Sequence, residues 1–136
     1  MGEYKKAKEV WQEARSKSLV VDEFAYATIL STLRHLEDYD GALAMYSNEI
    51  LPLQIRNSFI DSQIVDCYAK KGLVSEAKTI FYNMLTNGLD VKSYAFTSLV
   101  KAMLDDGDAA GEVVGMLTQY GRQFSELDKS FWPQVV

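Results

Sequence analysis

The sequence is poor in the residues that build covalent or metal-held frameworks. It contains one cysteine, Cys67, and one histidine, His35, among 136 residues. A single thiol excludes an internal disulfide framework and a thiolate metal cluster, and one His with one Cys does not make a zinc site. A lone cysteine in a helical pattern is typical of a small buried apolar residue, and we interpret Cys67 in that way. We interpret His35 as a helix-end residue.

Glycine, proline and long apolar runs are also scarce. Eight glycines and two prolines are too few for a collagen-like or disordered chain. No apolar run approaches the roughly 18 residues that a membrane helix needs, so we expect no membrane partner. Helical periodicity begins directly after the first six residues, and we see no signal or transit peptide. The net charge of −5 argues against strong non-specific binding of nucleic acid.

Patterns that carry catalysis are missing as well. There is no Ser/His/Asp or Cys/His arrangement, no phosphate-binding glycine loop, and no pair of histidines on one helix face. The acidic residues that cluster, such as Asp105 and Asp106, lack the spacing of metal ligands and are interpreted as solvated. We therefore expect no enzymatic activity, no metal, no cofactor and no small-molecule substrate.

What the sequence does contain is a repeat with a step of 35 residues. Residues of one type return at this step in several columns: Ala7, Ala42 and Ala77; Trp11, Tyr46 and Phe81; Ile29, Ile64 and Leu99. Such a period is typical of one supersecondary unit that stacks on copies of itself to bury its apolar face. The pattern favours a binding surface over an enclosed active site.

Each period contains two apolar stripes with the i, i+3, i+4, i+7 spacing of amphipathic helices. The first stripe comprises Tyr26, Ile29, Leu30 and Leu33, then Ile64, Val65 and Tyr68, then Phe96, Leu99, Val100 and Met103. The second comprises Ala42, Met45 and Tyr46, then Ala77, Ile80, Phe81 and Met84. Breaks such as Lys71-Gly72 and Asn87-Gly88 separate the stripes, and the latter favours a left-handed helix cap. The unit is predicted to be a helix hairpin, and the fold class all-α.

The step divides the chain into units that begin in the middle of a repeat. We assign 1–21 to the second helix of a truncated unit, with Trp11 in its core. Three full units follow over 22–56, 57–91 and 92–126, and 127–136 is the start of a further helix or a cap. The third unit is degenerate.

Strict spacing in the third unit would put Glu112 at the alanine position of the second stripe. A two-residue deletion instead gives an apolar stripe of Ala110, Val113, Val114 and Leu117. We favour the deletion because it leaves no buried carboxylate.

Several segments resemble the pentatricopeptide repeat (PPR) family. The resemblance is carried by Tyr68-Ala69-Lys70-Lys71-Gly72, by Asn87-Gly88-Leu89, and by helix openings at Tyr26-Ala27-Thr28-Ile29-Leu30 and Phe96-Thr97-Ser98-Leu99-Val100. Tetratricopeptide repeats, with a 34-residue step, have a Trp/Leu-Gly/Tyr pattern that is not found here. The resemblance implies a right-handed α-solenoid of helix-hairpin repeats with a 35-residue period, whose first helices line a concave groove. It also implies binding of single-stranded RNA, about one base per repeat, in a mitochondrion or chloroplast.

The family's contact positions can be carried onto this chain column by column. The position that packs against a base plane falls on Phe24, Phe59 and Tyr94. The position that meets the base edge falls on Ala27, Ser62 and Thr97. The partner position at the end of each repeat falls on Asn57, Lys92 and Leu127, with Asp22 serving the truncated unit. No complete pair of edge and partner residues matches the family's recognition pattern.

The sequence is compatible with two functions. The first is an RNA-binding segment in RNA stabilisation, splicing, editing or translation, motivated by the repeat and its periodic aromatic residues. The second is a helical scaffold that binds protein inside an organellar ribonucleoprotein or transcription complex, motivated by the charge of −5 and by Ala27. Core packing is an equally weighted interpretation of Phe24, Phe59 and Tyr94.

Overall fold

A computed structural model describes residues 6, 9, 12–13, 22–107 and 110–120. The helix expected within 1–21, with Trp11, lies almost entirely outside this part of the chain. The helix start expected at 127–136, with Leu127, lies outside it altogether. All regular elements within the described residues are helices, in the order α2 (Glu23–His35), α3 (Tyr39–Met45), η1 (Tyr46–Ile50), α4 (Ser58–Lys70), α5 (Val74–Thr86), α6 (Ser93–Asp106) and α7 (Ala110–Tyr120).

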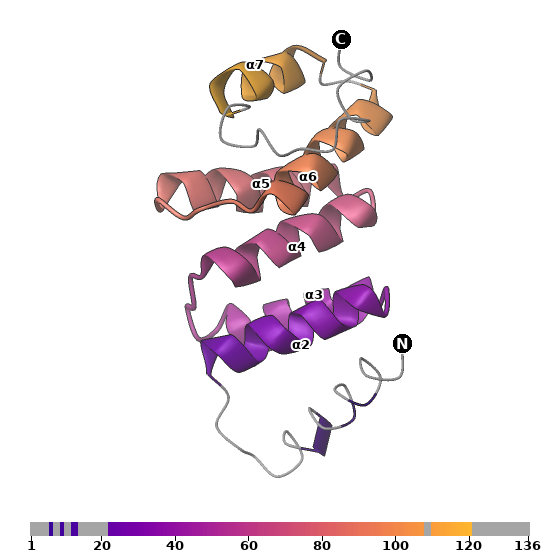
Figure 1. Ribbon diagram of the computed structural model, residues 1–136, viewed down its shortest axis with the longest axis vertical. Coiled ribbons are helices and arrows are strands. Elements are labelled where there is room, and N and C mark those ends of the chain that lie inside the picture. The colour runs from indigo at the N-terminus through magenta and orange to yellow at the C-terminus, as the bar shows by residue number, and fades with distance from the viewer. Residues whose placement is uncertain (1–5, 7–8, 10–11, 14–21, 108–109, 121–136) are drawn as a thin grey trace.

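The helices pack as successive hairpins, which stack along the long axis of the molecule (Figure 1). Helix α4 contacts α5, its hairpin partner, and also α2 on one side and α6 on the other. The all-α prediction is confirmed.

The first helices begin where their sequences supply caps. The Asp22 side chain accepts a hydrogen bond from the Ala25 N–H, and the Asn57 side chain accepts two, from Phe59 and Ile60. These bonds satisfy backbone donors that a helix start otherwise leaves unpaired. Helix α6 begins after Lys92, which makes no such side-chain bond.

The helices end in left-handed residues at matched places. Gly72 and Gly107, 35 residues apart, have φ of +77° and +81°, and Gly88 has φ of +70°. Glu37, which is 35 residues before Gly72, has φ of +58° although it carries a side chain. The turn geometry is thus kept in the first hairpin without the residue that suits it best.

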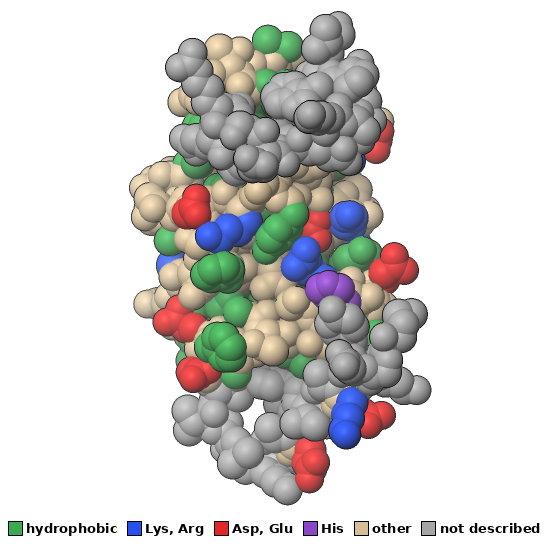
Figure 2. Space-filling view, in the orientation of Figure 1, with side chains coloured by type: hydrophobic (Ala, Val, Ile, Leu, Met, Phe, Trp, Pro, Cys, Tyr) green, Lys and Arg blue, Asp and Glu red, His purple; other side chains and the backbone are tan. Residues whose placement is uncertain are grey.

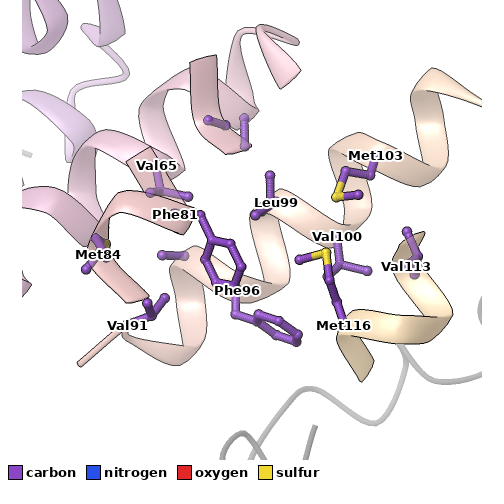
Figure 3. Packing of buried hydrophobic residues seen from close by; sticks show 13 residues of the cluster. Val65, Phe81, Met84, Val91, Phe96, Leu99, Val100, Met103, Val113 and Met116 are labelled. Carbon is purple, nitrogen blue, oxygen red and sulfur yellow. The ribbon is translucent and has the colours of Figure 1, made fainter. Parts of the chain in front are cut away.

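The core is made of the two stripes predicted from periodicity. Phe81, Phe96, Leu30, Ile64, Leu99 and Val100 are fully buried, as are Ala42 and Ala77. Figure 3 shows Phe81 of α5 directed at Phe96 of α6, and their ring centroids are 6.0 Å apart. Tyr68 and Ile80 pack against both apolar clusters and join them into one core.

The buried residues of α7 differ from the apolar stripe expected for the third unit. Val113 and Met116 are buried, whereas Val114 is 57% exposed and Ala110 is also exposed. The two-residue deletion is therefore wrong. Glu112 stays at the rim of the core, where its carboxylate accepts hydrogen bonds from Lys78 Nζ (2.9 Å) and the Tyr82 hydroxyl (2.8 Å). Because these partners hold the carboxylate at the rim, strict spacing leaves no unpaired buried charge.

The second helix of the first hairpin contains a π-helical turn, η1. A π-helical turn contains one residue more than an α-helical turn. The residue with positive φ that follows the helix is Gln54, with φ of +57°. Its counterpart 35 residues on is Leu89, one position after Gly88. The period is restored by Asn57 because the connection to α4 is one residue shorter.

Candidate nucleic-acid interface

The three aromatic residues predicted to contact bases lie in the first turns of α2, α4 and α6. Phe24 is 80% exposed, Phe59 58% and Tyr94 38%. Phe24 and Phe59 are too exposed for core residues, so the interpretation as core is wrong for these two. Tyr94 is more covered, because it packs against Arg34 of α2. All three line one open groove of about 800 Å³. Figure 2 shows hydrophobic and basic side chains side by side on the face that α2 and α4 present in Figure 1.

Two of the rings carry a cation on one face. Lys92 Nζ lies 4.4 Å from the centroid of the Phe59 ring, and Arg34 Cζ lies 4.5 Å from that of Tyr94. Both distances are within the range of a cation–π contact. No cation is placed on the Phe24 ring by the described residues.

Arg34 is the centre of a polar network that the sequence analysis did not identify. Its Nε donates to Asp66 Oδ2 (2.9 Å), and its Nη1 donates to Gln63 Oε1 (2.9 Å). Gln63 Nε2 in turn donates to the Ala27 carbonyl (3.0 Å), and the Ser98 hydroxyl donates to Asp66 Oδ1. The network ties α2, α4 and α6 together directly beneath the groove.

A helical period on the groove side would have revealed these residues. Phe59, Gln63, Asp66 and Lys70 follow one another at i, i+4, i+7 and i+11, so they lie on one face of α4. The apolar stripe of α4 lies on the opposite face of the helix. The spacing of these four residues therefore indicates a polar face on α4. It does not show which residues of other helices they bond.

The predicted base-edge residues differ in accessibility. Ser62 is fully buried, and its hydroxyl accepts a hydrogen bond from the Lys92 backbone N–H (3.1 Å). Ala27 is partly exposed and lines the aromatic groove, but its methyl group cannot hydrogen-bond a base. Thr97 is partly exposed and lines a second cleft. Of these residues, Thr97 alone presents a hydroxyl to a solvent-filled space.

The residues predicted at the partner position make contacts within the protein. Asn57 Oδ1 caps α4, and Asn57 Nδ2 donates to Glu23 Oε1 (3.1 Å). Asp22 caps α2. Lys92 Nζ pairs with Asp90 (2.9 Å) besides contacting Phe59. Leu127 lies outside the described residues.

A second cleft, of about 630 Å³, lies between α4 and α6 next to the aromatic groove. Arg34 and Tyr94 line both spaces. The cleft also contains Lys70 and Lys101 and the acidic residues Asp66 and Asp105. With three basic and two acidic side chains, its lining has a formal charge of +1, against −5 for the chain.

The single cysteine and the single histidine line neither of the two spaces. Cys67 is fully buried, and burial raises the pKa of its thiol to about 12, which confirms its interpretation as an apolar residue. His35 is the last residue of α2, as predicted. Among the described residues, no three His, Cys, Asp or Glu side chains are grouped as metal ligands. No described helix is both long and apolar enough to cross a membrane.

Comparison with known proteins places the chain beside repeat proteins. The family model described as "PPR repeat" matches residues 62–89, which span most of the α4–α5 hairpin. A mitochondrial pentatricopeptide repeat-containing protein of Arabidopsis thaliana is 30% identical over 83 residues. The aligned part is 61% of this chain and 8% of that protein, so the chain spans only a small fraction of this relative.

Proposed function

Because this chain belongs to the pentatricopeptide repeat family, we propose that it binds single-stranded RNA on the groove face of α2, α4 and α6. The proposed setting is organellar RNA metabolism, in stabilisation, splicing, editing or translation. The proposed compartment is a mitochondrion or chloroplast, and the similar Arabidopsis protein, mitochondrial by name, supports the first of these. The proposal includes no catalytic step.

The proposed architecture is a right-handed α-solenoid with a 35-residue period and repeats at 22–56, 57–91 and 92–126. Its support is the spacing of the first helices, which begin at Glu23, Ser58 and Ser93. The same step separates Phe24, Phe59 and Tyr94, so a strand running along the groove meets a ring once per repeat.

The observation that carries the proposal is the row of exposed aromatic rings in one groove. Exposed Phe24 and Phe59 rings cost free energy in water, and neither is covered by the described residues. A base has a flat apolar face of matching size, and stacking contributes ~1–3 kcal/mol per base. Every base has such a face, so the contact tolerates any sequence.

We propose that base-edge reading is weak in this chain. The Ser62 hydroxyl and the Asn57 amide are already bonded within the protein, and Ala27 has no polar group. Thr97 and Lys92 are the remaining candidates for contacts with base edges or the backbone. Binding should therefore depend on single-strandedness and stacking more than on sequence.

The test is fluorescence anisotropy of a randomised single-stranded RNA pool, at low and at physiological salt. We expect saturable binding that weakens with salt and is lost when Phe24, Phe59 and Tyr94 are all changed to Ala. Exposed Tyr82 on α5, changed to Ala, is the matched control and should leave binding unchanged. Equal affinity of the parent and the triple variant would overturn the proposal.

A second candidate function is a scaffold that binds protein in a ribonucleoprotein or transcription complex. It is favoured by the internal bonds of Ser62 and Asn57 and by the overall charge of −5. Partner proteins that remain bound to the chain after nuclease treatment of an organelle extract would support it. Partners recovered only while RNA is intact would count against it.

A further inference from the structure

We propose that Arg34 is an anchored binding site for a phosphodiester group of the RNA backbone, in the cleft between α4 and α6. In this arrangement Tyr94 holds the guanidinium in place and does not serve as a third base platform. The inference rests on the proposed RNA-binding function and assigns the two sides of the groove to different parts of the ligand.

The guanidinium is fixed by contacts on three sides. Asp66 binds Nε, Gln63 binds Nη1, and the Tyr94 ring lies against the guanidinium face at 4.5 Å. The Arg34 side chain is 18% exposed, so it has little freedom to move. A guanidinium that is already ordered loses little further entropy when it binds a ligand.

Donors remain on this fixed group. A guanidinium has five N–H donors, and within the described part of the chain only Nε and Nη1 have hydrogen-bond partners. Three N–H groups are therefore available, on Nη1 and Nη2. A phosphate offers two oxygens at the spacing of this fork, which makes a bidentate pair.

Asp66 offsets the charge of Arg34, so the net attraction for an external anion comes from the other cations of the cleft. One of its oxygens is occupied by Arg34 Nε and the other by the Ser98 hydroxyl. Lys70 and Lys101 line the same cleft and form no ion pair or hydrogen bond with other described residues. The lining has a formal charge of +1 in a chain of charge −5, so an anion is drawn to this part of the surface.

The position of the cleft identifies the anion as backbone phosphate. Arg34 and Tyr94 line both the cleft and the aromatic groove, so the two spaces are adjacent. A strand whose bases stack on Phe24 and Phe59 brings its next phosphates to Arg34. Phe59 and Tyr94 each carry a cation on one face, but Phe59 is 58% exposed and Tyr94 only 38%, so Tyr94 has the least free ring surface of the three.

The experiment uses a fluorescent single-stranded oligomer of abasic phosphodiester units, which has a charged backbone and no bases. Its binding to the full chain is followed by anisotropy over a range of salt concentrations. The double variant Arg34→Gln/Asp66→Asn removes the guanidinium without changing net charge or leaving a buried charge unpaired. We expect it to bind the abasic oligomer about tenfold more weakly.

A second variant does not touch the anchoring network. Lys101→Gln should lower the slope of log K against log salt by about 0.7, the value for one phosphate contact in a single strand. Lys78→Gln, on α5 outside the cleft, makes the same change in charge and should leave the slope unchanged. Tyr94→Ala should weaken abasic binding because it releases Arg34, whereas Phe24→Ala should not.

The possible results separate this inference from the proposed function. Abasic binding that is absent, or that is equal in the parent and the Arg34 variant, overturns the phosphate site whatever RNA does. Abasic binding that depends on Arg34, with no gain from added bases, supports the phosphate site and overturns stacking. Polyglutamate that competes as well as the abasic oligomer would identify an acidic protein partner and contradict the assignment to phosphate.

Discussion

At the scale of single residues, two positions depart from the pattern that their counterparts follow. Glu37 takes the place of the turn glycines Gly72 and Gly107, and Asp61 takes the place of the buried aromatic residues Tyr26 and Phe96. Both departures have a cost in free energy that follows from elementary chemistry. Each therefore gives a substitution that should stabilise the protein.

Replacing Glu37 with glycine should raise the free energy of unfolding. A side chain at φ of +58° is strained by roughly 1 kcal/mol, and glycine removes the strain while adding some entropy to the unfolded chain. We expect a net gain of about 0.5–1 kcal/mol in urea denaturation. Gly72→Ala is the reverse test and should lose about 1 kcal/mol; no atom lies within 4 Å of the added methyl, so strain is isolated from crowding. A loss of stability in Glu37→Gly would contradict this interpretation.

Asp61 should make the protein less stable as pH rises. The carboxyl is 4% exposed, and its Oδ1 has no hydrogen-bond partner among the described residues. Burial raises its pKa to about 6, with Arg56 opposing the rise. Because the folded state holds the proton more tightly than the unfolded state, stability from this group is greatest below about pH 4. It falls between about pH 4 and pH 6 and then stays level.

Asp61→Asn should therefore stabilise the fold at pH 7 and have little effect at pH 4. A pKa difference of about two corresponds to a gain on the order of 2 to 3 kcal/mol at neutral pH. The measurement is the midpoint of thermal unfolding of the parent and the variant at both pH values. A gain of the same size at both would show that shape, and not charge, is the cause.

At the scale of helices, much of the arrangement could be predicted from the sequence. The apolar stripes gave the buried faces of α2 to α6, and Asn87-Gly88 and Gly72 marked helix ends that have the expected positive φ. These features are local, because each depends on residues within one or two turns.

Features that depend on distant partners were not predicted. Which side of α7 faces the core depends on the bonds that Lys78 and Tyr82 of α5 make to Glu112. These pairs are 34 and 30 residues apart in sequence. The π-helical turn η1 gave no recognisable pattern. At the candidate site, the exposed aromatic rings stand in the predicted columns, but the bonds that occupy Ser62 and Asn57 join residues 30 to 34 apart. A periodic pattern shows which face a residue is on, and not which partner it meets.

Asn57 should contribute to stability through its cap of α4. Asn57→Ala removes the acceptor for the Phe59 and Ile60 N–H groups and should cost about 1 kcal/mol. Lys92→Ala, at the equivalent position before α6, is the matched control, because Lys92 makes no side-chain cap bond. Urea denaturation of both variants is the measurement. Equal losses would show that capping is not what distinguishes the two helix starts.

At the scale of the whole molecule, the hairpins are joined on both faces of their first helices. On one face the two apolar clusters meet through Tyr68 and Ile80. On the other, the Arg34 network connects α2, α4 and α6. The groove is therefore held at a fixed shape by the same residues that line it.

The network predicts non-additive effects of substitution. Arg34→Gln alone leaves the Asp66 carboxylate, which is 7% exposed, without its charged partner. The loss should be on the order of 2 to 4 kcal/mol. Adding Asp66→Asn should recover most of it, since a neutral pair needs no compensation. A double-mutant cycle by chemical denaturation measures the coupling, and purely additive losses would contradict the network.

RNA binding on the groove face is tested most directly by locating RNA on the folded chain. A single-stranded oligonucleotide containing 4-thiouridine is cross-linked to the protein by light, and the adducts are located by mass spectrometry. Binding of RNA on the groove face predicts adducts in peptides from α2, α4 and α6, close to Phe24 and Phe59. Adducts confined to α3, α5 and α7, or a yield no higher than that of a double-stranded control, would contradict it.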